Sequence, residues 1–253
     1  MQNTRVVVTG AARDFGRTLA IRFAELGAEV FLSARSLTAA EATRDEIRAL
    51  GRDHVHAFAC DLGDPESVRE FARQVGERTD RVDILLNNGA RWLDATDLDA
   101  VGDDEITATI ASGGSGTVLM TKHFLPLLRA SERPDIVNLI SSVASPRGDM
   151  GVGNPAFCAA KGAQANFAEI MSQRLRPLGV RVISLYPPDF RNIDPLREEW
   201  DQAERGPDSQ LTSRSLLDCV LFAVNQPRDC FIRSFAFEPT ASPPAGGAAS
   251  SEV

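Results

Sequence analysis

The chain has 253 residues, of which 43% are hydrophobic and 25% are charged, and its formal net charge at pH 7 is −8. These values are typical of a globular protein, and the acidic balance argues against nucleic acid or an anionic membrane surface as its partner. No apolar run is long enough for a membrane span, and the four cysteines show neither a C-x-x-C pair nor metal-ligand spacing, so we expect reduced thiols, no metal site and a cytoplasmic location.

Runs with strand and helix patterns alternate along the chain. The β-branched run RVVVTG at 5–10 predicts a buried parallel strand, and it begins so early that we expect no signal peptide. The amphipathic segment 15–27 predicts a helix that Gly27 closes. The alternation continues with strand 28–34, helix 37–51, strand 54–60, helix 64–78, strand 82–88, helix 116–130, strand 135–142, a helix after Asn154, strand 180–188, helix 212–226 and strand 230–237.

This alternation predicts one α/β domain over residues 1–240, a doubly wound parallel sheet with helices on both faces. The polar segment 194–210 is interpreted as a lid over the carboxyl edge of the sheet. The tail 241–253 is rich in Ala, Gly, Ser and Pro and is expected to be disordered.

The loop TGAARDFGR, between the first strand and the first helix, indicates a nucleotide site. Gly10 permits a tight turn, Gly16 permits close helix packing, and the helix N-terminus offers N–H groups to a diphosphate. Asp14 stands where a glycine would let the backbone approach phosphate, and it adds a negative charge. Such a loop is a weak signal alone, but its place after the first strand strengthens it.

The end of the second strand favours NADP(H) over NAD. An NAD site usually has an acidic residue here, whereas this sequence has Arg35, with Arg13 as a second cation in the loop. Two guanidinium groups suit a 2'-phosphate through charge-assisted hydrogen bonds. The alternative is that Arg35 is only a solvated loop residue. Asp61, after the third strand, is placed to contact an adenine edge or to cap the next helix.

Six segments, TGAARDFG, CDLGD, LLNNGA, LISSVAS, FCAAKGA and RVISLYPPDFRN, occur in this order between Arg5 and Thr240. In order and spacing they resemble the short-chain dehydrogenase/reductase family. The resemblance implies a seven-stranded Rossmann sheet and hydride transfer between nicotinamide and a carbonyl or carbinol carbon, carried out by an Asn-Ser-Tyr-Lys set. It also implies a homodimer or homotetramer.

The resemblance carries over unevenly to the catalytic positions. Ser142 and Lys161 match the family Ser and Lys, but the family Tyr falls on Phe157 and the family Asn falls on Gly113. Phe157 and Lys161 are four residues apart, on one helical face. The resemblance also implies a cofactor site made of Gly10, Arg13, Asp14, Phe15, Gly16, Arg35, Asp61, Leu62, Asn88, Gly89, Lys161, Pro187 and Asn192.

A ketone reduced without the family Tyr needs another proton donor. Ser142, with Lys161 and water behind it, is the preferred candidate. Tyr186 is the only tyrosine of the chain, and we expect it with Phe157 and Asp189 in the substrate pocket. Asp149, Asp189 and Cys158 are weaker candidates. Losing a general acid typically costs 10²–10⁴-fold in rate, which slows a reductase without forbidding its reaction.

Three functions therefore stay open at this stage. The preferred one is an NADPH-dependent reductase of a small-molecule ketone or secondary alcohol, in a tailoring step of bacterial secondary metabolism such as polyketide or nucleoside antibiotic synthesis. The second is a nucleotide-binding regulatory protein without redox activity. The third is a dehydratase or isomerase on the same fold.

Overall fold

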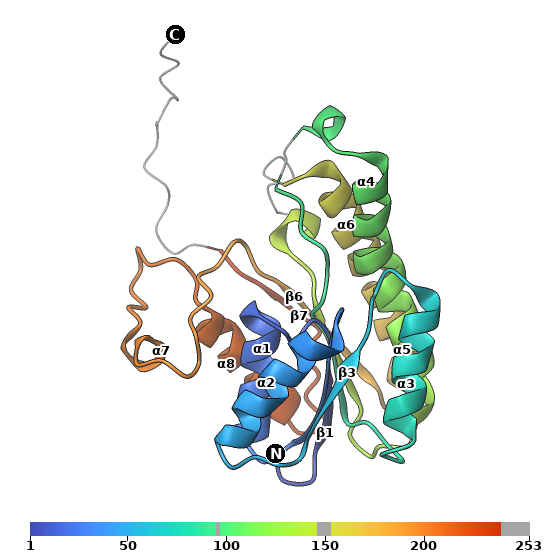
Figure 1. The fold of residues 1–253 in the computed structure, drawn as a ribbon, viewed down its shortest axis with the longest axis vertical. Coiled ribbons are helices and arrows are strands. Elements are labelled where there is room, and N and C mark those ends of the chain that lie inside the picture. Colours follow the sequence, from blue (N-terminus) through green and yellow to red (C-terminus); the bar gives the residue numbers. More distant parts are fainter. Residues whose placement is uncertain (95–96, 146–152, 239–253) are drawn as a thin grey trace.

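The computed structural model describes residues 1–94, 97–145 and 153–238 (Figure 1). Within them, seven strands form one parallel sheet in the order β3-β2-β1-β4-β5-β6-β7. The strands are β1 (Arg5–Val8), β2 (Glu29–Ala34), β3 (Val55–Ala59), β4 (Ile84–Asn87), β5 (Asp135–Leu139), β6 (Arg181–Tyr186) and β7 (Ser234–Ala236). The predicted single-domain Rossmann fold is confirmed. Residue 149 and the predicted tail 241–253 lie outside the described residues.

Helices cover both faces of the sheet (Figure 1). They are α1 (Asp14–Glu25), α2 (Leu37–Ala49), α3 (Pro65–Gly76), α4 (Asp103–Ile110), α5 (Gly116–Arg129), α6 (Pro155–Leu175), α7 (Glu199–Gln202) and α8 (Ser213–Asn225). Helices α1, α2 and α8 pack on one face, and α3, α5 and α6 pack on the other. Successive strand residues supply the two cores in turn, because side chains alternate across a strand: Val6 and Val8 face α1, whereas Val7 faces α3 and α5.

Helix α4 was not predicted from the sequence. It continues through a π-helical turn, Ala111–Ser115, into α5. Two adjacent glycines make this turn a poor helix by propensity. A Cβ on Gly113 would lie 3.0 Å from the Cβ of Ala160, and one on Gly114 would lie 3.5 Å from that of Ala163. The close approach of α6 therefore explains glycine here, and tertiary packing outweighs local propensity.

All seven strands are shorter than predicted, and the hydrogen bonds beside β5 and β7 show why at two of them. β5 ends at Leu139, because the N–H of Ser142 turns to the carbonyl of Pro187, 2.8 Å away. β7 is confined to Ser234–Ala236, because the carbonyl of Cys230 accepts a side-chain hydrogen bond from Arg181 at 2.9 Å in place of a strand partner.

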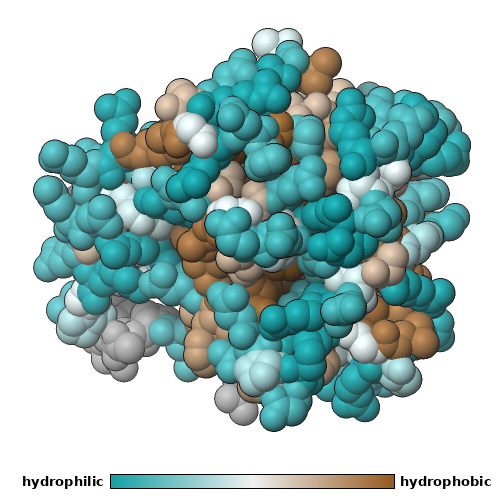
Figure 2. All heavy atoms as spheres, turned by 90° about the horizontal axis from the view of Figure 1, so that it is seen from below, coloured by the Kyte–Doolittle hydropathy of each residue, from teal (hydrophilic) through white to brown (hydrophobic). Residues whose placement is uncertain are grey.

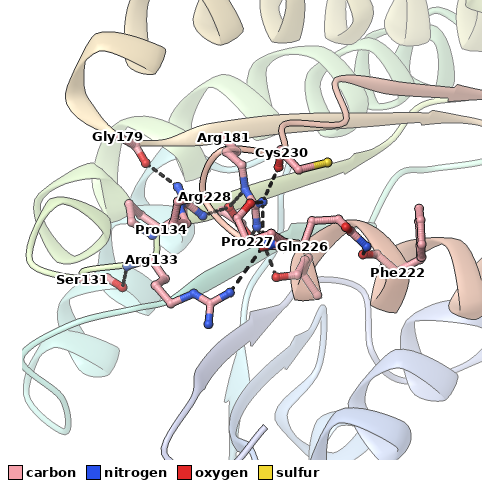
Figure 3. A network of polar contacts seen from close by, with 12 residues as sticks. Ser131, Arg133, Pro134, Gly179, Arg181, Phe222, Gln226, Pro227, Arg228 and Cys230 are labelled. Atoms are coloured by element: carbon pink, nitrogen blue, oxygen red, sulfur yellow. Dashed lines mark hydrogen bonds and ion pairs between the residues drawn. The ribbon is translucent and has the colours of Figure 1, made fainter.

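A buried ion pair fastens the amino ends of β5 and β6 to the segment after α8. Arg181 donates two hydrogen bonds to the carboxylate of Asp135, at 2.8 and 2.7 Å, and both side chains are 5% exposed or less. The guanidinium also donates to the carbonyls of Val224, Gln226 and Cys230 (Figure 3). Every polar group of the pair thus has partners, which a buried charge requires.

The predicted lid, 194–210, is attached to α1 and α8. Asp194 pairs with Arg17 at 3.0 Å, and the guanidinium of Arg22 lies 4.6 Å from the ring centroid of the buried Trp200. Arg214 donates to the carbonyl of Trp200 at 2.8 Å. That the segment 194–210 covers a substrate stays a prediction.

The face of the molecule seen from below in Figure 2 is mostly hydrophilic, with hydrophobic residues visible between polar ones near its middle.

Replacing Asp135 by Asn should destabilise the fold strongly, because it leaves the Arg181 charge buried without its counter-ion. We expect the free energy of unfolding in urea to fall by about 3 kcal/mol or more. Asp218→Asn is the matched control, because Asp218 pairs with Arg205 at the surface, and it should change stability by less than about 1 kcal/mol. Equal effects of the two substitutions would contradict the role given to the buried pair.

Candidate active site

The loop after β1 packs backbone to backbone against the loop after β4. Gly10 has a left-handed φ of +66°, and a Cβ there would lie 2.7 Å from the Cα of Gly89. A Cβ on Gly16 would lie 2.2 Å from the carbonyl oxygen of Gly10. Thr9 Oγ1 accepts hydrogen bonds from the N–H groups of Asn88 and Gly89, at 3.0 and 3.1 Å. Only glycine fits at these contacts, which set the conformation of the loop at the start of α1.

Asp14 opens α1 in an unfavourable conformation. Its φ is +50°, in the left-handed region that favours glycine, although Asp tolerates it better than most residues. The carboxylate lies 3.5 Å from Arg13 Nε, and both side chains are exposed. It stands at the positive end of the α1 dipole, where a diphosphate would also bind. Asp14 therefore competes with an anionic ligand for the same end of the helix.

Arg13 and Arg35 lie at the carboxyl ends of the neighbouring strands β1 and β2. Both are exposed, and Arg35 has no ion-pair partner within the described ranges. Asp61 follows β3, and its Oδ1 accepts from the N–H of Gly63 at 2.8 Å. These three strands are adjacent, so the two arginines and Asp61 lie along one edge of the sheet.

Two other predicted cofactor residues have packing contacts. A Cβ on Gly89 would lie 2.6 Å from Cδ1 of Leu62, so the Leu62 side chain packs over the loop after β4. Phe15 is buried, with its ring 5.7 Å from that of Phe190 in an edge-to-face arrangement, so its side chain belongs to the core.

The amino group of Lys161 is enclosed under the end of β5. Lys161 Nζ donates to the carbonyl of Leu139 at 2.7 Å and to Gln164 Oε1 at 3.1 Å. Burial lowers its pKa from the ordinary 10.5 to about 7, and no charged group contributes to this shift. The side chain thus changes protonation near neutral pH, which is where a proton-transfer group is most effective.

Phe157 occupies the position one turn before Lys161 and is itself covered. Its ring centroid lies 5.7 Å from Lys161 Nζ and 4.7 Å from the ring of Trp92, which meets it edge to face. Phe157 is 7% exposed and Trp92 is 56% exposed. An aromatic pair therefore stands over the lysine, with Trp92 at the surface.

Ser142 begins a short 3-10 turn, Ser142–Ala144, that packs against α6. Its N–H is held by Pro187, the first residue after β6, so the exits of β5 and β6 are tied together. The hydroxyl of Ser142 has no hydrogen-bond partner in the part of the chain that the structure describes. Ser142 is half-buried.

The other predicted pocket residues are engaged elsewhere or exposed. Tyr186 is half-buried, and burial raises the pKa of its phenol while a hydrogen bond with Ser184 opposes this. Asp189 accepts from Gln210 at 3.1 Å, and Asn192 is exposed. Burial raises the pKa of the Cys158 thiol, which argues against a reactive thiolate.

Known proteins are similar to this chain in sequence and in structure. Residues 4–203 match the short chain dehydrogenase family. The chain belongs to this family. Human retinol dehydrogenase 13 is 31% identical over 199 residues, which are 72% of this chain and 57% of the human protein. This chain therefore spans somewhat over half the length of that relative.

Two solved structures extend the comparison. A metagenomic short-chain oxidoreductase in complex with NADP superimposes with a TM-score of 0.78 over 95% of this chain and 99% of its own, at 26% identity. A short chain dehydrogenase from Burkholderia cenocepacia J2315, also in complex with NADP, gives 0.76 over 92% and 95%, at 27% identity. No helix in the described part of this short-chain dehydrogenase is long and apolar enough to cross a membrane.

Three residues of the site were missed by sequence reasoning. Gln164 and Thr117 form a hydrogen-bonded chain with Lys161, and Trp92 covers Phe157. The three-residue spacing of Lys161 and Gln164 on a helix is a signal that could have indicated the first contact. Thr117 and Trp92 carry no comparable signal, because their contacts are between separate elements.

The depressed pKa of Lys161 predicts a pH-dependent stability. Its folded pKa of about 7 lies below the ordinary 10.5, so between these values the unfolded chain binds a proton that the folded chain does not. The free energy of unfolding therefore rises with pH across this window. Below pH 7 the folded state carries the full cost of burying the charged lysine. We expect the wild type to gain about 2 kcal/mol from pH 7 to pH 9 relative to Lys161→Met in urea unfolding.

Lys122→Met is the matched control, because Lys122 is exposed on α5. The difference in free energy of unfolding between Lys122→Met and the wild type should be independent of pH. A pH-independent difference for Lys161→Met as well would show that Lys161 is charged throughout this range.

Proposed function

We propose that the protein is an NADPH-dependent reductase that interconverts a ketone and a secondary alcohol of a small molecule. The observation that carries the proposal is that a buried lysine, Lys161, and a serine whose hydroxyl has no partner among the described residues, Ser142, lie on two segments that pack together where β5 ends. The third catalytic position holds a phenylalanine, so the chemistry has to proceed without a phenol.

The nucleotide end fits the cofactor that the solved relatives contain. Gly10 and Gly16 leave a cradle that a Cβ would fill, and Arg13 and Arg35 are exposed cations at the same edge. We infer that the arginines hold the 2'-phosphate and that the α1 N-terminus holds the diphosphate. The remaining contacts are assigned to Asp61, Leu62, Asn88, Gly89, Lys161, Pro187 and Asn192, and to the backbone of Asp14 and Phe15, because the Phe15 side chain lies in the core and the Asp14 carboxylate repels an anion.

When bound, NADPH supplies the hydride to the carbonyl carbon. The carbonyl oxygen then carries negative charge and needs a proton. Ser142 donates that proton from its free hydroxyl, and Lys161 returns one to Ser142 through water. Two of the three N–H groups of a protonated Lys161 already have acceptors in Leu139 and Gln164, which leaves one for this task. Trp92 and Phe157 provide an apolar wall for the substrate.

The substrate is proposed to be a small molecule in a tailoring step of bacterial secondary metabolism, and the enzyme to be a cytoplasmic homodimer or homotetramer. The competing function is nucleotide binding without turnover. The absence of the phenol and the cover over Phe157 favour that alternative, so binding and turnover are measured separately.

Substitutions at Ser142 and Phe157 test the mechanism. NADPH oxidation is followed against a panel of small ketones. Ser142→Ala should lower kcat by about 10²-fold, the usual contribution of a proton donor, with NADPH affinity unchanged. Phe157→Tyr should raise kcat at least about tenfold, because a hydroxyl is added near the Lys161 amino group.

Ser141→Ala is the matched control on the same turn, because Ser141 only accepts a backbone hydrogen bond from Val143. It should change kcat less than about twofold. Full activity of Ser142→Ala would exclude Ser142 as the donor. NADPH binding without oxidation of any ketone in the panel would favour the regulatory alternative.

Asp14→Gly should tighten NADPH binding about three- to tenfold in a fluorescence titration. The substitution removes a carboxylate from the diphosphate end of α1 and relieves the left-handed strain at φ +50°. Asp14→Asn separates the two causes, because it removes the charge and keeps a side chain. Affinity that is unchanged in both variants would show that Asp14 does not face the cofactor.

A further inference from the structure

A chain of three hydrogen bonds runs from Lys161 into the space between α5 and α6. Lys161 Nζ donates to Gln164 Oε1 at 3.1 Å, Gln164 Nε2 donates to Thr117 Oγ1 at 3.0 Å, and Thr117 Oγ1 donates to the carbonyl of Gly113 at 2.9 Å. The side chains of Lys161, Gln164 and Thr117 are 4%, 1% and 3% exposed. The chain ends in the π-helical turn, at the residue that replaces the family Asn.

While Lys161 is protonated, only one arrangement of donors satisfies this chain. A protonated lysine can only donate, so the oxygen of the Gln164 amide must face Lys161 and the nitrogen must face Thr117. The Thr117 oxygen then accepts, and its own hydrogen goes to the Gly113 carbonyl. The amide of Gln164 therefore cannot flip without breaking two bonds in a buried place, where unpaired polar groups are costly.

Among the described residues, the acceptors around the Lys161 amino group are Leu139 and Gln164, and they come from different elements. The carbonyl of Leu139 ends β5, and Gln164 lies one turn further along α6. Together they fix the direction of the remaining N–H. The Phe157 ring, which lies beside the Lys161 amino group, and the Thr117 hydroxyl, which accepts from Gln164, are both uncharged.

We propose that Gln164, held in place by Thr117, is a positioning residue that orients the Lys161 amino group and stabilises its protonated form. The role in catalysis rests on the reductase function proposed above, whereas the effect on the lysine does not. Gln164 acts through Lys161, to which it is hydrogen-bonded.

The test uses the fact that the chain has two lysines, Lys161 and the exposed Lys122. Protein labelled with ¹³C at lysine Cε gives two NMR signals, which Lys161→Met assigns. In the wild type the Lys161 signal should titrate near pH 7. In Gln164→Met, which keeps the length of the side chain and removes the acceptor, the pKa of Lys161 should fall by about one pH unit, as expected for loss of a hydrogen bond to a charged group.

Three further variants make the result specific. Gln164→Glu keeps an acceptor and adds a negative charge, so it should raise the pKa of Lys161 above the wild-type value. Thr117→Val frees the Gln164 amide and should lower the pKa of Lys161 by a smaller amount. Gln173→Met is the matched control, because Gln173 lies exposed on the same helix and bonds only to Glu169. It should leave both lysine signals unchanged.

Activity gives an independent readout. Gln164→Met should lower kcat about tenfold with little change in the KM for NADPH, and it should shift the Lys161 limb of the pH profile in the direction seen by NMR. An unchanged Lys161 titration in both Gln164→Met and Gln164→Glu would overturn the proposal. An NMR shift in a protein without reductase activity would instead uphold the positioning of Lys161 and refute only the proposed reaction.

Discussion

The enclosed amino group of Lys161 is the constraint on which the site depends. A charge inside a protein needs acceptors of fixed geometry, and here they come from the end of β5 and from α6 itself. These two contacts hold α6 against the end of β5. Phe157 and Ser142 therefore lie near the lysine, because Phe157 lies one turn earlier on α6 and Ser142 follows β5 by three residues.

The fold could be predicted from the sequence because its rules are local and repetitive. Buried β-branched runs between amphipathic segments admit little besides a parallel sheet covered on both sides. The predictions that were wrong or missing concern long-range contacts. Helix α4 and its π turn depend on the approach of α6 to Gly113, and the late start of β7 depends on Arg181, which lies 49 residues before Cys230. The sequence of α4 and that of the stretch before β7 contain no pattern that indicates these distant partners.

The candidate site was predictable to the same degree. Residues inside recognisable motifs, such as Gly10, Gly16 and Lys161, could be named in advance. Those that act through another residue were not named: the spacing of Gln164 from Lys161 permits a contact, but only the position of Thr117 beside Gln164 shows that the amide is held there. The structure also redistributes roles among the named residues, since Phe15 belongs to the core.

The two residues that differ from the family pattern, Gly113 and Phe157, both lie close to Lys161. Phe157 stands one turn before it on α6, and Gly113 packs against Ala160, the residue before it. A Cβ at position 113 would lie 3.0 Å from that of Ala160, so an asparagine there would require the π turn or α6 to give by a few tenths of an ångström. The Gly113 carbonyl accepts from Thr117, four residues later along the same helical segment, and so ends the hydrogen-bonded chain through Gln164. Restoring a tyrosine at Phe157 would therefore return a phenol to a site whose lysine is already held from the other side by Gln164.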